Sequence, residues 1–252
     1  MFEHFKGEEV FVKKVLDYLD QVQYKQRLIL TQFLDPYHQS IVKSVIGHQD
    51  EVQVLENGGF IHSESQRIII APYFYEIEKE DFEIVVCKII YAKNFEKLTH
   101  RDILGALMSL GIKRELFGDI VEKDKGFYLA VDRHIYEYLK DHLSMIKRSK
   151  VKFVEWDEEI EVKNDYLVKS FIVSSFRLDK IISSFYKISR QKAAEFIRAG
   201  HVKVNHKLVE QINYLCNNKD IISFKKHGRV MFVDCNKQTR SDNYVVEGYF
   251  YK

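Results

Sequence analysis

A narrow apolar stripe marks the segment that follows residue 176. Leu178, Ile181, Ile182 and Phe185 recur at i, i+3, i+4 and i+7, which brings them to one face of an α-helix. Polar and cationic side chains gather on another face: Arg177, Lys180, Ser184 and Lys187. The pattern predicts a short amphipathic helix over 177–186.

A second helix is predicted between Ser189 and Gly200. Serine is a good N-cap because its hydroxyl accepts a hydrogen bond from a free amide of the first turn, and glycine ends helices because it adopts the left-handed conformation easily. The residues expected to face the core are small or apolar: Ala193, Ala194, Phe196 and Ile197. Arg190 and Lys192 fall in the first turn, where cations oppose the helix dipole, so a phosphate bound there would remove the conflict.

Short strands follow the two helices. Val202 and Val204 alternate with Lys203, which predicts a strand with the lysine pointing away from the core. A turn is expected at 205–207, and a second turn at 225–229 joins two apolar strands. The segment from 177 to 233 therefore reads as two helices followed by a small, hairpin-rich sheet.

The middle of the chain carries a longer alternation of patterns. Between residues 81 and 156 the expected elements are a strand at 82–91, a helix at 99–110, strands at 118–122 and 127–131, a helix at 132–145 and a strand at 151–156. The order β-α-β-β-α-β is that of a ferredoxin-like sandwich, which the RRM also uses.

The third of these strands raises the question of base stacking. Lys125-Gly126-Phe127 opens it as an RNP1 segment would, but Tyr128 stands where a small residue is usual and Leu129 where a second aromatic is usual. Two readings stay open: a sheet face that stacks RNA bases, and an ordinary sheet face.

The whole chain is expected to have an α+β fold in several parts. The N-terminal part predicts helices at 8–20 and 37–46, a hairpin over 52–61 and a strand at 67–71. The expected division is a helical and hairpin region at 1–75, a ferredoxin-like or RRM-like domain at 76–157, an acidic linker at 158–174, a basic module at 175–235 and a tail at 236–252 that is free to add a strand.

Charge is distributed unevenly along the chain. Residues 175–235 hold 12 Lys and Arg against 5 Asp and Glu, a net charge of +7, whereas the whole chain is only +2 and the remainder is therefore −5. A compact basic module is the electrostatic footprint of nucleic-acid binding, although a solvated lysine-rich surface would give the same count.

Composition and motifs exclude several other classes. The apolar runs are far too short to span a membrane, and no N-terminal signal pattern is present. Cys87, Cys216 and Cys235 have no zinc-like or disulfide-framework spacing, so three reduced thiols in a cytoplasmic protein are expected. There is no glycine-rich nucleotide loop, and the ten histidines lack ligand spacing, so neither a cofactor nor a metal is expected.

Several spaced motifs of the basic module resemble the alpha-L RNA-binding domain, also called the S-four domain. They are R-L-D-K-x-I at 177–182, S-R-Q-K-A at 189–193, I-R-A-G-H-V-K-V-N at 197–205 and D-I-I-S-F at 220–224. The chain departs from that family at His206, where glycine is usual. Histidine adopts positive φ less readily than glycine, so a hairpin of another type is one outcome.

The candidate RNA site consists of the cations and two polar residues of this module. Phosphate contacts are expected from Arg177, Lys180, Arg190, Lys192, Arg198, Lys203, Lys207, Lys225 and Arg229. Ser189 and Asn205 are expected to supply hydrogen bonds and to fix the local geometry.

Nearly the whole chain resembles the bacterial YlmH family. The similarity is carried by T-Q-F-L-D-P at 31–36, the helical segment at 98–108 and above all G-I-K-R-E-L-F-G-D-I at 111–120. The resemblance implies a non-enzymatic factor that binds rRNA and tRNA on the large ribosomal subunit carrying peptidyl-tRNA, in the rescue of stalled nascent chains and alanine tailing. Lys113 and Arg114 are a candidate second RNA contact, and a local ion pair with Glu115 or Asp119 is the alternative.

Two other functions remain as alternatives. Arg177-Leu178-Asp179 is similar to a catalytic segment of pseudouridine synthases, which would make the protein an RNA-modifying enzyme that uses the S-four domain for targeting. The surrounding residues of that catalytic segment are missing. An adaptor for cell-division proteins is the third possibility, because the YlmH family is also associated with division.

Overall fold

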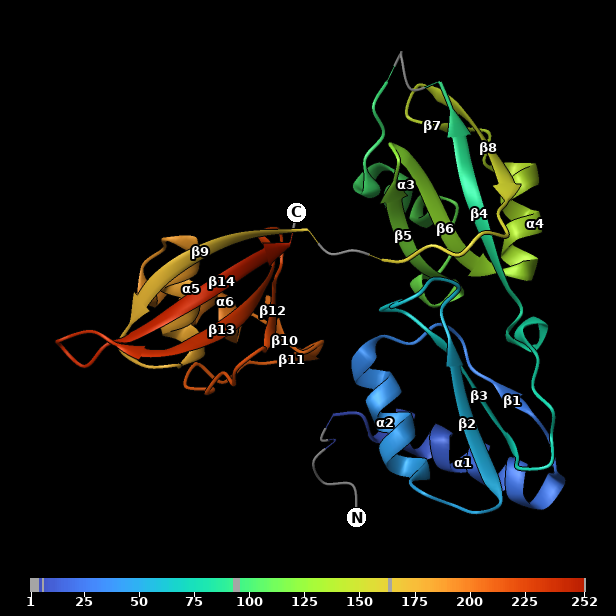
Figure 1. The fold of residues 1–252 in the computed structure, drawn as a ribbon, viewed down its shortest axis with the longest axis horizontal. Helices are drawn as coiled ribbons and strands as arrows, with labels where there is room; N and C mark the ends of the chain where they lie inside the picture. Colours follow the sequence, from blue (N-terminus) through green and yellow to red (C-terminus); the bar gives the residue numbers. More distant parts are fainter. Residues whose placement is uncertain (1–4, 6, 93–95, 163–164, 252) are drawn as a thin grey trace. The chain divides into compact units, whose positions relative to one another are not determined.

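The computed structural model describes residues 5, 7–92, 96–162 and 165–251. The chain forms two compact units, Met1–Val162 and Lys163–Lys252 (Figure 1). Each unit has hydrophobic clusters of its own. An α+β fold class is thereby confirmed, and the two units are taken in turn.

The first part of the first unit is a small sheet covered by two helices. Its elements are α1 (Glu9–Lys25), β1 (Ile29–Leu30), α2 (Pro36–Ile46), β2 (Val52–Asn57) and β3 (Arg67–Pro72). The strands are antiparallel in the order β1-β3-β2, and buried residues of both helices pack on Ile68 and Ile70. Asp35 starts α2 by accepting a hydrogen bond from the His38 amide at 2.9 Å, and Pro36 follows at the first helical position.

Two expectations for this part are corrected. Helix α1 continues to Lys25 rather than residue 20, because Val22 extends its buried stripe by another turn. The hairpin expected over 52–61 does not form within that segment, since β2 pairs with β3 and the connection between them runs from 58 to 66. That connection has a separate role, described below.

The second part of the first unit is the predicted sandwich. Its elements are β4 (Ile84–Tyr91), α3 (His100–Ser109), β5 (Phe117–Lys123), β6 (Gly126–Asp132), α4 (Arg133–His142), β7 (Met145–Ile146) and β8 (Ser149–Glu155), with short 3-10 turns η2 (Lys79–Phe82) and η3 (Arg114–Leu116). The sheet order is β5-β6-β4-β8-β7. Its four long strands follow the order 4-1-3-2 of the ferredoxin-like fold, which confirms that prediction.

Helices α3 and α4 cover one face of this sheet. Thr99 and Asp102 form a reciprocal capping box at the start of α3, and Asp132 caps α4. Helix α4 ends at His142 rather than residue 145, because Met145 and Ile146 leave the helix to form β7. The helices and the sheet enclose the largest core of the unit, which includes Phe127.

The other face of the sheet is covered by the chain itself. Phe60, from the connection between β2 and β3, and Ile160 pack on Tyr128 and Ala130. Tyr128 is only 3% exposed and meets Trp156 edge-on, with ring centroids 5.2 Å apart. Phe127 points into the opposite, helix-side core. Bases therefore cannot stack on Tyr128 or Phe127, and the RNP1-like reading is wrong at these positions.

The acidic segment is not a free linker. Ile160 is 1% exposed, and the Ile61 and Val162 amides form hydrogen bonds that attach 160–162 to residue 61. The apolar residues of this acidic run hold it against the first unit, while 166–173 forms a strand of the second unit. The expected linker at 158–174 therefore belongs largely to the two folded units.

The second unit is a six-stranded antiparallel sheet with two helices on one side (Figure 1). Its elements are β9 (Tyr166–Val173), α5 (Leu178–Tyr186), α6 (Arg190–Arg198), β10 (Val202–Val204), β11 (Lys207–Leu208), β12 (Ile221–Phe224), β13 (Gly228–Gln238) and β14 (Tyr244–Tyr251). The strand order is β11-β10-β12-β13-β14-β9. The four predicted stripe residues of α5 are all buried in the core between helices and sheet.

The C-terminal residues form part of this sheet. Strand β13 continues through the expected domain boundary at residue 235, and β14 lies between β13 and β9. Val246 is fully buried in the core. The segment expected to be a tail is therefore an inner strand, because its alternating apolar residues complete the core on one face.

Candidate nucleic-acid interface

Helices α5 and α6 form a helical pair, and Asp179 connects the starts of the two helices. Its side chain is 2% exposed and accepts hydrogen bonds from Arg177, at 3.0 and 3.3 Å, and from Arg190 Nε at 2.6 Å. Arg177 precedes α5 and Arg190 opens α6, so one carboxylate joins the starts of both helices. Their side chains keep 34% and 54% exposure, which leaves guanidinium surface in contact with solvent.

Charge pairing sets the protonation state of this cluster. Burial by itself would raise the pKa of the Asp179 carboxyl, but the hydrogen bonds and positive charges of Arg177 and Arg190 outweigh burial and lower the pKa below its usual range. The carboxylate stays ionised at neutral pH, holding two guanidinium groups side by side. Arginine carries five N–H donors in a planar fork, so such groups suit phosphate oxygens.

The first turn of α6 has the predicted form. The Ser189 hydroxyl accepts a hydrogen bond from the Lys192 amide at 3.2 Å, which confirms the cap. Arg190 and Lys192 are exposed in that turn, and Arg198 is exposed in the last turn. Cations at the positive end of a helix favour a bound anion, since each raises the local potential. Lys180, on α5, donates to the Ser174 hydroxyl at 2.9 Å.

Asn205 has a structural role at the β10–β11 hairpin. Its side-chain NH2 group donates to the Asp220 carboxylate at 2.8 Å, and its side-chain oxygen accepts from the Ile221 backbone amide at 2.8 Å. Asp220 is buried and also accepts from the Asn217 amide. Asn205 and His206 have φ values of 47° and 68°, so the two-residue loop has the type I′ character that glycine usually provides. Histidine at 206 does not change the hairpin type.

The remaining predicted cations lie on the sheet and its turns. Lys203 is exposed on β10, and Lys225 is exposed in the turn before β13. The Arg229 guanidinium lies over the Tyr251 ring, 4.5 Å from its centroid. Strand alternation places Lys203 and Arg229 on the sheet face away from α5 and α6, because their neighbours Val202, Val204 and Val230 are buried in the core. Lys207 is half-buried on β11.

Lys113 and Arg114, the candidate second RNA contact, differ in their surroundings. Lys113 is exposed. The Arg114 guanidinium donates to the carbonyl oxygens of Phe117 and Gly118 and to Ser65 Oγ, and desolvation lowers its pKa. These bonds fasten β5 to the loop before β3, so Arg114 has a structural role although part of its side chain is exposed.

Asp119, expected as an ion-pair partner of Arg114, forms its hydrogen bonds with backbone amides. Asp119 accepts hydrogen bonds from the Glu64 amide at 2.6 Å and from the Ser65 amide at 3.2 Å. Burial raises the pKa of its carboxyl. Arg114 and Asp119 thus hold the same loop through separate hydrogen bonds.

Sequence reasoning left Asp179 out of the site. The sequence did contain a signal for its role. Asp179 lies beside Leu178 and Ile181 at the start of a buried stripe, and a buried acid needs a cationic partner, which a module of net charge +7 can supply. Arg177 is adjacent in sequence, but Arg190 reaches the same carboxylate only because α5 and α6 pack together.

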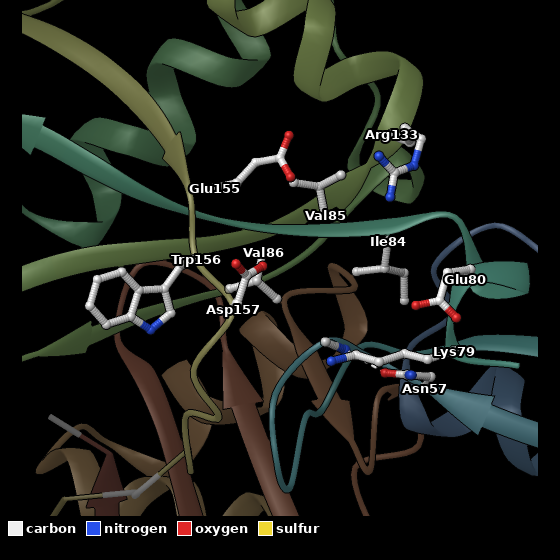
Figure 2. A pocket seen from close by; sticks show the side chains of 11 residues that line it. Asn57, Lys79, Glu80, Ile84, Val85, Val86, Arg133, Glu155, Trp156 and Asp157 are labelled. Atoms are coloured by element: carbon white, nitrogen blue, oxygen red, sulfur yellow. Dashed lines mark hydrogen bonds between the residues drawn. The ribbon is translucent and has the colours of Figure 1, made fainter.

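The first unit contains a small cavity of about 160 Å³ (Figure 2). Trp156 and Asp157 lie at one end, and Lys79 and Glu80 lie at the other. Its volume is below the roughly 300–1,000 Å³ of ordinary small-molecule sites. Within the described part of the chain, no three His, Cys, Asp or Glu side chains gather as metal ligands would. None of the described helices is long and apolar enough to cross a membrane.

Family models match all three parts of the chain. Residues 7–74 match "YlmH, N-terminal", residues 78–159 match "Putative RNA-binding domain in YlmH", and residues 176–222 match the "S4 domain". The second unit, with its arginine pair and exposed cations, thus places the protein in the class of S-four-domain RNA-binding proteins.

Similarity to individual proteins identifies the family within this class. The ribosome-associated protein quality control protein P2 of Bacillus subtilis (strain 168) is 32% identical over 255 residues, which cover 98% of this chain and 96% of the relative. The solved structure of the cell division protein ylmH from Streptococcus pneumoniae matches with a TM-score of 0.53 and 29% identity, over 62% of this chain and 96% of that chain. The chain belongs to the YlmH family, which confirms the resemblance of its motifs.

Proposed function

We propose that this protein is a non-enzymatic factor that binds rRNA and tRNA on the large ribosomal subunit and acts in the quality control of stalled nascent chains, including alanine tailing. The proposal places it in the cytoplasm, associated with ribosomes. Support comes from the S-four domain and from the name of the Bacillus subtilis relative. The observation that carries it is the pair of guanidinium groups held by Asp179 beside the cationic first turn of α6.

The phosphate surface proposed for this function is the helical pair. Arg177 and Arg190 are oriented by a buried carboxylate, whereas Lys192 and Arg198 extend along the exposed side of α6. Such contacts bind the RNA backbone without reading its sequence, and each neutralised phosphate makes the affinity more dependent on salt. A rigid pair of helices suits structured RNA, whose backbone holds its phosphates in a fixed arrangement.

A charge-reversal pair tests this surface without disturbing Asp179. The variant Lys192→Glu with Arg198→Glu changes two exposed residues of α6 and should abolish co-sedimentation with large ribosomal subunits at physiological salt. Lys13→Glu with Lys14→Glu, on the exposed side of α1, changes the net charge equally and should leave co-sedimentation intact. Unchanged binding of the α6 variant would show that the phosphate surface lies elsewhere.

The RNA-modifying alternative conflicts with the position of Asp179. A catalytic aspartate must contact its substrate, but this carboxylate is 2% exposed and is enclosed by two arginines. The proposal therefore expects deletion of the gene to leave every modified nucleotide of rRNA and tRNA in place. Mass spectrometry of RNA from deletion and parent strains measures this, and loss of one modified nucleotide would favour the enzyme.

A role in cell division remains a second candidate because of the name of the Streptococcus pneumoniae structure. In that case the protein would be an adaptor whose association with a division protein does not require RNA. Pull-downs before and after RNase treatment distinguish the two roles: capture of a division protein that resists RNase supports the adaptor, whereas its loss supports RNA-mediated association.

A further inference from the structure

The six-stranded sheet of the second unit has one face that α5 and α6 do not cover. Strands β9 and β14 extend that face beyond the residues that match the S4 domain, 176–222. Side chains on this outer side are exposed to an unusual degree for apolar residues, with Val168 at 46% and Ile172 at 61%. An exposed apolar surface is typical of an interaction site, and the residues beside it indicate the chemistry of the occupant.

The strand registers bring cations and tyrosines into one row across the sheet. Lys203 pairs with Ser223, Ser223 with Arg229, and Tyr251 with Tyr166, while Arg229 lies over the Tyr251 ring. Each step crosses one strand spacing of about 4.8 Å, so the row runs over most of the sheet. Residues far apart in the sequence thus form a continuous line from β10 to β9. This outer row consists of Lys203, Ser223, Arg229, Tyr251, Tyr166 and the adjacent Tyr249.

The aromatic end of the outer row is a cluster of three tyrosines. The Tyr166 ring meets Tyr251 edge-on at 4.9 Å and Tyr249 edge-on at 5.7 Å between centroids. All three are half-buried, so part of each ring stays in contact with solvent. Tyrosine rings and arginine planes both stack on nucleobases, and stacking needs no particular base.

Charge decides between RNA and a protein as the occupant. The cations of the row, Lys203 and Arg229, lie at the end nearest the β10–β11 hairpin, within the module of net charge +7. The acid on this face near the tyrosines is Glu247, which accepts a hydrogen bond from the Tyr249 hydroxyl two residues away along β14. A surface that combines cations with exposed aromatic rings suits single-stranded RNA, whose phosphates contact the cations and whose bases stack on the rings.

We propose that the outer row binds unpaired nucleotides of the RNA whose paired region contacts the helical pair. Bases stack on Tyr166, Tyr249 and the Arg229–Tyr251 pair, while Lys203 contacts phosphate. The proposal rests on the RNA-binding function proposed above and adds a second, chemically different subsite to it. The tyrosines come from β9 and β14, so the site depends on strands outside the matched S4 domain.

Two RNA probes separate this subsite from the helical pair. One is a blunt stem-loop, and the other is the same stem-loop with a six-nucleotide unpaired 3′ extension, each labelled with fluorescein and titrated with the full-length protein. The wild type should bind the extended probe more tightly. The variant Tyr166→Ala with Tyr249→Ala should lose about tenfold or more of the affinity for the extended probe, with unchanged affinity for the blunt one.

Controls keep this test independent of folding and of charge. Tyr166→Phe with Tyr249→Phe retains both rings and should bind both probes as the wild type does, and circular dichroism verifies that the alanine variant is folded. Because stacking releases no counterions, the alanine variant should keep the wild-type slope of log affinity against log salt. In contrast, Lys192→Glu with Arg198→Glu should weaken both probes and reduce that slope.

The outcomes are distinguishable. Equal affinity of wild type and alanine variant for the extended probe overturns the stacking subsite while the RNA-binding function stands. Normal RNA affinity with lost co-sedimentation on large ribosomal subunits would show that the outer row binds a protein, which also overturns the proposal. If the wild type binds neither probe and the α6 charge reversal has no effect on co-sedimentation, the proposed RNA-binding function itself fails.

Discussion

Asp179 shows how one acidic residue serves a basic surface. Arg177 and Arg190 would repel each other if they stood side by side without a counter-charge, and the buried carboxylate offsets that repulsion while fixing both guanidinium groups by hydrogen bonds. The cluster is thus ordered without a ligand. The phosphate binding proposed for it would cost little conformational entropy, because the arginines are already oriented.

The variant Asp179→Asn should destabilise the second unit by about 2 kcal/mol, because it leaves two adjacent cations without their buried counter-charge. Hydrogen exchange of the α5 and α6 amides measures the effect separately from the first unit. Asp20→Asn, at an exposed position of α1, is the matched control and should change nothing. Equal protection of α5 and α6 in both variants would contradict the structural role of the carboxylate.

The stability difference between the wild type and Asp179→Asn should depend on pH in a predictable direction. The folded state lowers the pKa of the Asp179 carboxyl, so its stabilising contribution is complete above the unfolded-state value of about 3.9 and is lost as pH falls through the lower folded value. The difference between wild type and Asp179→Asn should therefore be largest near neutral pH and should shrink in acid.

At the scale of elements, the middle sheet shows why a familiar strand order does not establish a familiar binding mode. The four long strands have the ferredoxin-like order, but Phe60 and Ile160 cover Tyr128 on the face where an RRM would stack bases. Gly59 makes this close approach possible: its φ is +85°, and a Cβ atom there would lie 2.9 Å from Val86 Cγ2.

Two glycine substitutions should therefore have opposite effects. Gly59→Ala should destabilise the first unit by about 2 kcal/mol, because it introduces both a strained φ and a clash with β4. Gly105→Ala, on the exposed side of α3 with open space around it, should stabilise the unit by up to about 1 kcal/mol through helix propensity. Urea unfolding followed by the fluorescence of Trp156, the single tryptophan, reports both, and a Gly59→Ala midpoint at or above the wild-type value would contradict the packing argument.

At the scale of the whole molecule, each unit has its own hydrophobic cores. The largest clusters lie within 85–153 and within 173–246, and each draws its residues from a single unit. Strand β14 contributes to the second of these cores although it lies at the end of the sequence. We therefore expect each unit to unfold without removing core residues from the other.

A chain that ends at Gln238 tests this independence. It lacks β14, which pairs with both β13 and β9, so α5 and α6 should lose their protection from hydrogen exchange. The urea midpoint reported by Trp156 fluorescence should stay at the full-length value, because that residue lies in the first unit. Persistent protection of α5 and α6 would show that the S-four domain folds without the added strand.

Periodicity and caps predicted the local structure well because they depend on neighbouring residues. The α5 stripe, the Ser189 cap and the alternation around Lys203 all lie within a few positions of the residues that cause them. The order of elements in the middle sheet was likewise readable, since each strand and helix has its own period. The charge asymmetry, a sum over the sequence, identified the basic module.

Contacts between distant segments were decided only by the tertiary structure. The sharing of Asp179 by two arginines needs the packing of α5 on α6, and the burial of Tyr128 needs residues from positions near 60 and 160. The outer row arises from the registers of five strands, two of which lie in segments expected to be a linker and a tail. The sequence by itself determined the family, the local elements and the basic module. The tertiary structure decided which cations are held by a carboxylate. It also decided which aromatic rings are buried and which are exposed, because these properties depend on segments brought together by folding.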